Sequence, residues 1–231
     1  MNLMRTTLLS SAVGAVLMAP SANAVFTINL ENGDKIELGG YAKADYRLID
    51  GNLNYRDVWI GNNPGVVPDG LTQTRFNIRE SRLSTRYTRG DVSAYVEIDF
   101  MGSDGNEVVT NSFDDRVRHF FITYKKNWLF GQTWSTFMPL AAIPESLDLG
   151  AGHAGKVFIR QPMVRFTYGG FSVALENPET VGGQGNANDS VPDLAARYIY
   201  KADWGQVGVA GLVRRVDAEG IDDTAVAGNI H

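Results

Sequence analysis

Arginine dominates the possible chemistry of this chain. Seven arginines and one lysine recur at short spacings in a few segments: Arg75, Arg79, Arg82, Arg86, Arg116, Arg118, Arg165 and Lys43. A guanidinium group stays charged at any physiological pH, and its planar fork of donors binds a carboxylate through two parallel hydrogen bonds. Such a set of side chains on one surface predicts contact with carboxylate-bearing anions.

Nearby acids offer these cations another role. Glu80, Glu97 and Asp99 lie in the same part of the sequence and could form ion pairs with the arginines. The arginines of residues 75–86 and 116–118 outnumber these three acids. We therefore expect part of the set to face a solute, while pairing explains the rest.

Enzyme motifs are missing from the sequence. It has no G-x-S-x-G, no H-E-x-x-H and no G-x-x-x-x-G-K-[ST], and its histidines are His119, His153 and His231. Asp114 and Asp115 with His119 would suggest an outer-membrane protease. The alternation of residues 115–124, however, predicts that His119 faces outward, which argues against this site. We expect neither catalysis nor a cofactor.

Composition excludes other classes. The 231 residues include no cysteine, so a disulfide scaffold and a thiolate metal site are ruled out. A net charge of -5 and a pI near 5.2 argue against a nucleic-acid-binding protein. The acidic stretch 217–223 reads as a solvated loop, with loose calcium binding as the alternative.

The first 24 residues read as a leader. Arg5 is followed by an apolar stretch over residues 8–18, and Ala22-Asn23-Ala24 matches a cleavage signal, which predicts a secretory signal peptide and a mature chain from Val25. An N-terminal anchor is the alternative, but the apolar stretch is too short to span a bilayer. No later segment has the roughly 18 apolar residues of a membrane helix.

Long alternating segments follow. Residues 34–50 place apolar or small side chains on one face and charged ones on the other. Residues 91–101, 171–176, 193–201 and 206–216 repeat this period of two, and the longest runs match tilted membrane-spanning strands.

Two segments break the alternation. In residues 73–88 the parity changes, so we place a β-bulge near Glu80 and Ser81, which brings the flanking arginines onto one face. In residues 115–124, Arg116 and Arg118 share a face opposite Val117 and Phe121, whereas Phe120 and Ile122 do not fit.

The connections alternate between tight turns and long loops, as in outer-membrane barrels. Six aromatic residues flank the short turns and predict an interfacial girdle: Trp128, Tyr168, Phe171, Tyr198, Tyr200 and Trp204. A soluble β-sandwich is the alternative, but its strands are shorter. An apolar face almost free of charge favours lipid, where a charge would cost about 2–4 kcal/mol at mid-membrane. The fold class is therefore all-β, a transmembrane antiparallel β-barrel.

Several motifs resemble those of trimeric sixteen-stranded bacterial porins. Residues 81–87 (SRLSTRY), 118–124 (RHFFITY) and 163–168 (MVRFTY) resemble porin strands. Residues 75–83 (RFNIRESRL), 96–100 (VEIDF) and 132–137 (QTWSTF) are similar to the DcaP-like porins in particular. That resemblance implies uptake of dicarboxylic and other small anionic compounds.

Nine strands are expected between residues 34 and 216. The resemblance therefore implies that residues 34–231 are the N-terminal part of a longer barrel, after a leader (1–24) and a short segment (25–33) without the coiled-coil extension of some relatives. It also implies that the loop at about 135–159 folds into the lumen as an eyelet. Glu145 and Asp148 on this loop would face the arginines and Lys43 across the pore.

The expected function is passive diffusion of small hydrophilic solutes, preferring anions such as dicarboxylates. A general, weakly cation-selective porin is the alternative, because Glu97, Asp99, Glu145 and Asp148 also line the path; a barrel enzyme or adhesin is a third class. The expected location is the outer membrane of a Gram-negative bacterium. The expected partners are membrane lipid, lipopolysaccharide and, by resemblance, two further copies in a homotrimer, with no nucleic acid and no metal.

Overall fold

The computed structural model describes residues 25–53, 66–102, 113–140, 143, 159–178, 190–218 and 221–231, which form almost only β-strands. In chain order the strands are β1 (Phe26–Asn29), β2 (Lys35–Tyr41), β3 (Asp45–Leu53), β4 (Val66–Asn77), β5 (Arg82–Arg89), β6 (Val92–Asp99), β7 (Arg116–Tyr124), β8 (Trp128–Trp134), β9 (Arg160–Tyr168), β10 (Phe171–Glu176), β11 (Asp193–Ala202), β12 (Gly205–Ala218) and β13 (Ile221–Ile230). The predicted leader lies outside the described residues.

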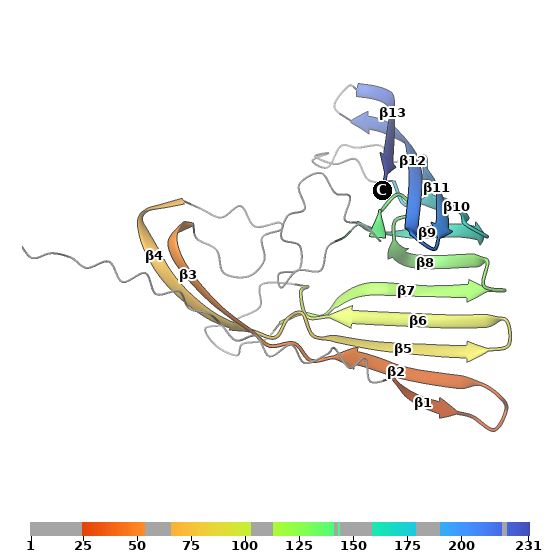
Figure 1. Cartoon of the computed structure of the whole chain (residues 1–231), viewed down its shortest axis with the longest axis horizontal. Coiled ribbons are helices and arrows are strands. Elements are labelled where there is room, and N and C mark those ends of the chain that lie inside the picture. The colour runs from red at the N-terminus through yellow and green to blue at the C-terminus, as the bar shows by residue number, and fades with distance from the viewer. Residues whose placement is uncertain are drawn as a thin grey trace, which may run out of the picture.

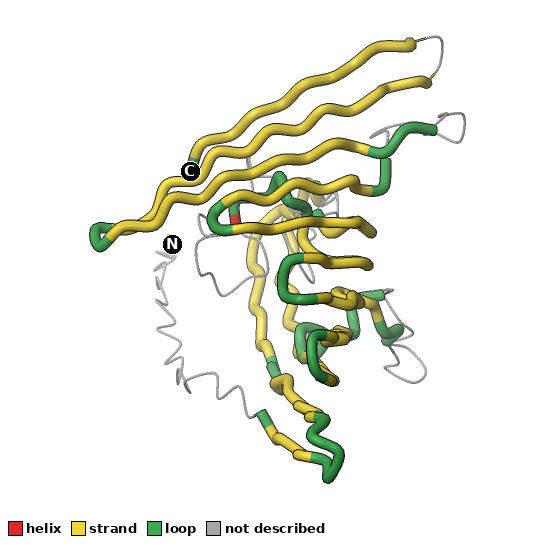
Figure 2. Tube along the Cα trace, turned by 90° about the vertical axis from the view of Figure 1, so that its right-hand side faces the viewer, coloured by secondary structure: helices red, strands yellow, loops and turns green. Residues whose placement is uncertain are grey.

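Eleven of these strands form one antiparallel sheet in the order β1-β2-β5-β6-β7-β8-β9-β10-β11-β12-β13. The sheet curls, so that β10 to β13 run across the direction of β5 to β7 (Figures 1 and 2). β3 and β4 pair separately and extend as a hairpin away from the main sheet (Figure 1). Among the described residues, no helix combines the length and the apolar character needed to cross a membrane.

The predicted alternation gives the curled sheet two distinct faces. One face, here called the outer face, exposes apolar side chains such as Leu83 (58%) and Phe120 (61%). The opposite face, here called the inner face, carries most of the charged residues of the strands, including buried Arg118 and Asp193. The predicted fold class, an all-β antiparallel wall of a membrane β-barrel, is confirmed, and eleven of the described strands form a curled sheet.

The first two predicted strands are each interrupted. Residues 42–44 separate β2 from β3, and residues 78–81 separate β4 from β5. Tyr41 pairs with Arg82 on one side of the break, and Asp45 pairs with Asn77 on the other, so three residues face four. The extra residue is the irregularity that the sequence predicted near Glu80 and Ser81, and it keeps the apolar side chains of both strands on the outer face.

A second bulge, which the sequence analysis did not place, lies in β7. Glu97 pairs with His119, but the next residue of β6, Ile98, pairs with Val117, so Arg118 is the extra residue. The bulge reverses the parity beyond it, which explains why Phe120 and Ile122 are exposed on the outer face. Phe121 therefore packs on the inner face against a small buried cluster, rather than facing outward as predicted.

The predicted aromatic girdle is present on the outer face. Trp128, Tyr168 and Trp204 are 41%, 73% and 71% exposed, and each lies at or beside a short turn between strands. Tyr198 and Tyr200 are also more than half exposed near the end of β11. Amphipathic rings at the ends of membrane strands suit the boundary between lipid and water.

Two strands lie where the sequence analysis expected none. β1 lies within the short segment 25–33 and pairs with β2. β13 occupies the region expected to be a loop and pairs with β12 along its whole length. The described acids of the stretch 217–223 therefore lie in paired strands, where Asp217 of β12 pairs with Asp222 of β13. No group of three or more potential metal ligands occurs in the described part of the chain.

Candidate functional site: the inner face of the sheet

A network of ion pairs covers the inner face of β5, β6 and β7. Arg116 donates from Nε and Nη2 to the two carboxylate oxygens of Asp99, at 3.0 and 2.6 Å. Arg118 donates from Nε to Glu97 Oε1 at 2.7 Å and from Nη1 to Asp99 Oδ2 at 3.1 Å. Arg82 Nη1 lies 3.8 Å from Glu97 Oε1. These five residues are here called the paired cluster.

The order of the strands explains the paired cluster. β6 carries the two acids and lies between β5 and β7, which carry the arginines. Asp99 is the direct cross-strand partner of both Arg82 and Arg116. Arg118, two residues beyond Arg116, lies inward beside them and is 2% exposed. Arg116 and Arg118 are thus bound by carboxylates of the same wall, whereas Arg82 only approaches Glu97 and its buried Nε has no hydrogen-bond partner in the described structure.

His119 faces inward, which corrects the prediction that it faces outward. The residue is 8% exposed, its Nδ1 lies 3.0 Å from Thr133 Oγ1, and its ring meets Trp134 edge-on at 5.4 Å. The reason is the β7 bulge, because the extra residue places Arg118 and His119 on the same face. These contacts give His119 a packing role in the wall.

A different arrangement holds three arginines of β9 and β11. Arg165 Nη1 donates to the backbone carbonyl of Trp134 at 3.4 Å, and Arg197 Nη1 donates to that of Met138 at 3.2 Å. The Arg160 guanidinium lies over the Trp134 ring, 4.6 Å from its centroid. Arg160, Arg165 and Arg197 are here called the second arginine group. Within the described residues, no carboxylate lies within 4.0 Å of any of them.

The second arginine group has donors to spare. Arg160 Nη1 and Arg197 Nε are buried and have no hydrogen-bond partner in the described structure. A guanidinium group has five N–H donors, and a buried donor without a partner is costly.

The chain that follows β8 crosses the inner face. Residues 135–140, here called the strap, begin with a tight turn in which Met138 N donates to Ser135 O at 3.1 Å. Residues 135–138 are all buried, and Met138 is 0% exposed. Phe137 packs with Ala195 and Ala210 of the inner face. The start of the predicted eyelet loop thus lies against the wall, whereas Glu145 and Asp148 lie outside the described residues.

The remaining predicted residues lie in separate surroundings. Lys43 forms an ion pair with Glu80 and lies 3.3 Å from Asp45. Arg79 is buried and donates to Phe100 O at 3.3 Å. Arg86 lies over the Tyr95 ring and 4.0 Å from Glu37.

Arg75 is the cross-strand partner of Arg47 in the β3–β4 hairpin, away from the main sheet. The structure therefore gathers Arg82, Arg116 and Arg118, places Arg165 in the second arginine group, and leaves Lys43, Arg75, Arg79 and Arg86 in surroundings of their own.

Sequence reasoning missed Arg160, Trp134, Glu176 and Arg197. The alternation of β10 and β11 already placed Glu176 and Arg197 on the polar face, and that parity is the signal that could have included them. Trp134 is the last residue of β8 and pairs with Arg160, the first residue of β9. At the ends of strands, alternation does not predict which way a side chain points.

An antiparallel sheet with an apolar, aromatic-rimmed outer face and a charged inner face defines the wall of an outer-membrane β-barrel protein. The model of the DcaP outer membrane protein family matches residues 80–226. The chain belongs to this family, which is a family of the outer membrane and not an enzyme class.

A solved structure supports the same assignment. The outer membrane channel DcaP of Acinetobacter baumannii is similar over 88% of this chain, with 25% sequence identity and a TM-score of 0.66. This chain spans 60% of the length of that channel. A search of curated proteins found no match.

Proposed function

We propose that this chain forms part of the wall of a porin through which small hydrophilic solutes diffuse, with a preference for anions such as dicarboxylates. The observation that carries the proposal is the second arginine group. Its guanidinium groups lie on the inner face with only carbonyl or ring partners among the described residues. Arginine side chains that line a pore favour anions, provided that each contact is weak enough to release the solute.

Reversal potentials test this preference. The protein in planar bilayers under a KCl gradient should give a potential of anion-selective sign. The double variant Arg165→Ala with Arg197→Ala should lower dicarboxylate flux about tenfold, as expected for the loss of a charge-assisted hydrogen bond. The flux of a neutral sugar should stay near the wild-type value.

A charge-preserving variant is the matched control. Arg165→Lys with Arg197→Lys keeps both positive charges and should keep the sign of the reversal potential. Equal loss of dicarboxylate and sugar flux in the alanine variant would show that the arginines only shape the lumen.

A weakly cation-selective porin is the second candidate. Glu97 and Asp99 on the inner face favour it, but both carboxylates are engaged by arginines of the paired cluster. A reversal potential of cation-selective sign in the wild type would establish this candidate in place of the first.

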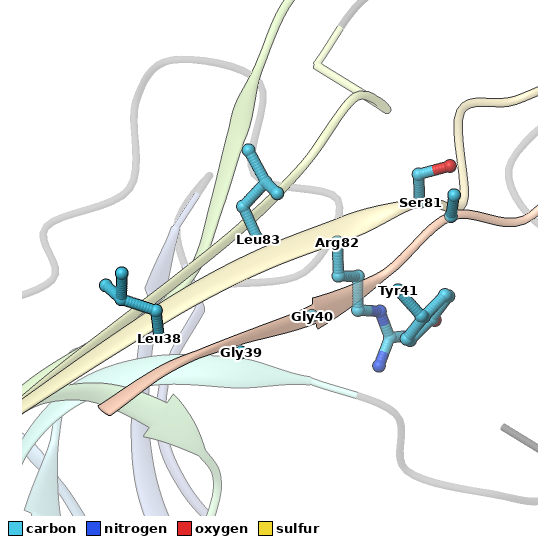
Figure 3. A pocket seen from close by; sticks show the side chains of 8 residues that line it. Leu38, Gly39, Gly40, Tyr41, Ser81, Arg82 and Leu83 are labelled. Atoms are coloured by element: carbon cyan, nitrogen blue, oxygen red, sulfur yellow. The ribbon is translucent and has the colours of Figure 1, made fainter. Parts of the chain in front are cut away.

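The proposal includes assembly as a homotrimer in contact with lipid and lipopolysaccharide. Its support is the outer face near Gly40, where Ala42 and Ala44 are exposed and would allow a second wall to approach closely. A shallow pocket of about 380 Å³ lies there; Figure 3 shows Leu38 and Leu83 on one side of the strands and Arg82 with Tyr41 on the other. Native mass spectrometry of Ala42→Trp should show loss of the trimer if this surface is the interface, and a trimer as in wild type if it is not.

A further inference from the structure

The strap lies on a floor of small side chains. Ala195 and Ala210 of the inner face are 0% and 4% exposed, and Phe137 packs between them with Leu212 beside the cluster. Larger side chains at these positions would hold the strap away from the wall. The inner face of β11 and β12 is therefore shaped to receive this segment.

Three consecutive strap residues are bound through their backbones by three different strands. Thr136 N donates to Oε1 of Glu176, a residue of β10, at 2.6 Å. Phe137 O accepts from Nδ2 of Asn229 in β13 at 2.8 Å. Met138 O accepts from Nη1 of Arg197 in β11 at 3.2 Å. Because each contact uses a backbone group of the strap, these three hydrogen bonds do not depend on its side chains.

Glu176 makes the shortest of these contacts, at 2.6 Å. The residue is 3% exposed, and a hydrogen bond to a charged acceptor is roughly twice as strong as a neutral one. The same carboxylate interacts electrostatically with Arg165 and Arg197. Removing it would leave the Thr136 N–H unsatisfied and both guanidinium groups without a balancing charge.

We propose that Glu176 is a positioning residue of the pore, whose carboxylate holds the strap against the inner wall and so keeps the lumen beside Arg165 and Arg197 at a constant width. This inference rests on the proposed passage of solutes through the lumen. Glu176 thus keeps the backbone of the strap out of the path of the solute.

Single-channel recording tests the role of the acceptor. Glu176→Ala should give a current that switches between levels, because the strap detaches and returns. Glu176→Gln keeps an oxygen that accepts from Thr136 N and should give a steady current close to wild type. Ser172→Ala is the matched control, because Ser172 lies on the same strand and face but bonds Thr167 instead of the strap.

A steady current in Glu176→Ala would overturn the proposal. Identical switching in the Ala and Gln variants would also overturn it, because the acceptor would then be irrelevant.

Thiol labelling gives a readout that does not depend on ion selectivity. The chain has no cysteine, so Met138→Cys introduces a single thiol at a fully buried strap position. A charged thiol reagent should label it about tenfold faster in the Glu176→Ala background than with Glu176 present, as expected for the loss of one charge-assisted hydrogen bond. Equal labelling rates would contradict the positioning role, even if the reversal potential shows the proposed anion preference.

Discussion

The two arginine-bearing regions of the inner face differ in what neutralises their charge. In the paired cluster of β5 to β7, Asp99 and Glu97 bind Arg116 and Arg118 within hydrogen-bond distance. In the second arginine group of β9 and β11, the direct contacts are backbone carbonyls and the Trp134 ring, and Glu176 acts on Arg165 and Arg197 only from beyond ion-pair distance. The difference teaches that the number of arginines on a wall does not decide its affinity for anions, since a saturated guanidinium contributes mainly to the stability of the wall.

The largest expected effect is that of Asp99→Ala in the paired cluster. Asp99 is 1% exposed and bonds both Arg116 and Arg118, so its removal leaves Arg116 without a carboxylate among the described residues and leaves Arg118 with Glu97 alone. Breaking a buried ion pair costs about 3–5 kcal/mol, which should appear as a lower free energy of unfolding in a urea titration. The same variant should shift the reversal potential further toward anions.

An unchanged reversal potential in this variant would contradict the view that the paired cluster and the second arginine group differ only in how their charge is neutralised. The freed guanidinium groups would then not face the solute path, and the two regions would differ in more than charge balance.

Arg118→Lys should have a smaller effect. The lysine keeps the charge but cannot bond Glu97 and Asp99 through two fixed donors, as Arg118 does from Nε and Nη1. We expect a loss of about 1.5–3 kcal/mol in the free energy of unfolding, the usual contribution of a hydrogen bond to a charged group. The reversal potential should stay at the wild-type value; a clear shift would show that Arg118 contacts permeating ions.

Salt should separate the two regions in the wild type. Screening lengths fall from about 10 Å at 0.1 M to about 3 Å at 1 M salt, and partly solvated charges are screened more than buried pairs. Anion preference should therefore weaken as the KCl concentration rises at a fixed concentration ratio, while the thermal stability of the protein changes little. Selectivity independent of salt would mean that pore width, and not the second arginine group, sets it.

Thr136→Val should have the smallest effect. Thr136 is fully buried, its hydroxyl oxygen has no hydrogen-bond partner in the described structure, and its backbone N–H makes the contact with Glu176. Replacing the hydroxyl by a methyl group should leave the free energy of unfolding within about 0.5 kcal/mol of wild type or raise it. A large loss of stability, measured by the same urea titration, would show that the strap is held by this side chain as well as by its backbone.

Glycine limits how the bulged strands can vary. Gly40 has a φ of +135°, and a Cβ there would lie 2.2 Å from the carbonyl oxygen of Arg82. The residue is the last but one of β2, beside the break between β2 and β3, so the close approach of β2 and β5 there depends on the missing side chain. The same break keeps Leu83 on the outer face and Arg82 on the inner one.

Much of the fold was predictable because a strand has a period of two. Leu83 and Phe76 on the outer face and Glu97 and Asp99 on the inner face follow directly from alternation, and so does the irregularity near Glu80. The bulge at Arg118 was not predictable, since the sequence shows only that Phe120 and Ile122 do not fit. His119 was therefore placed on the wrong face, and β13 was missed because its acidic start resembles a loop.

By itself the sequence determined the class of wall, an alternating antiparallel sheet with arginines on the polar face, because alternation and charge are local properties of each strand. Only the tertiary structure decided which arginines are neutralised. Arg118 meets Asp99 through a bulge and a register between strands, and Arg197 meets the Met138 carbonyl because the strap folds onto a strand that lies 59 residues away in the chain. Pairing depends on distances between segments far apart in the sequence, and those distances are set by the curl of the whole sheet.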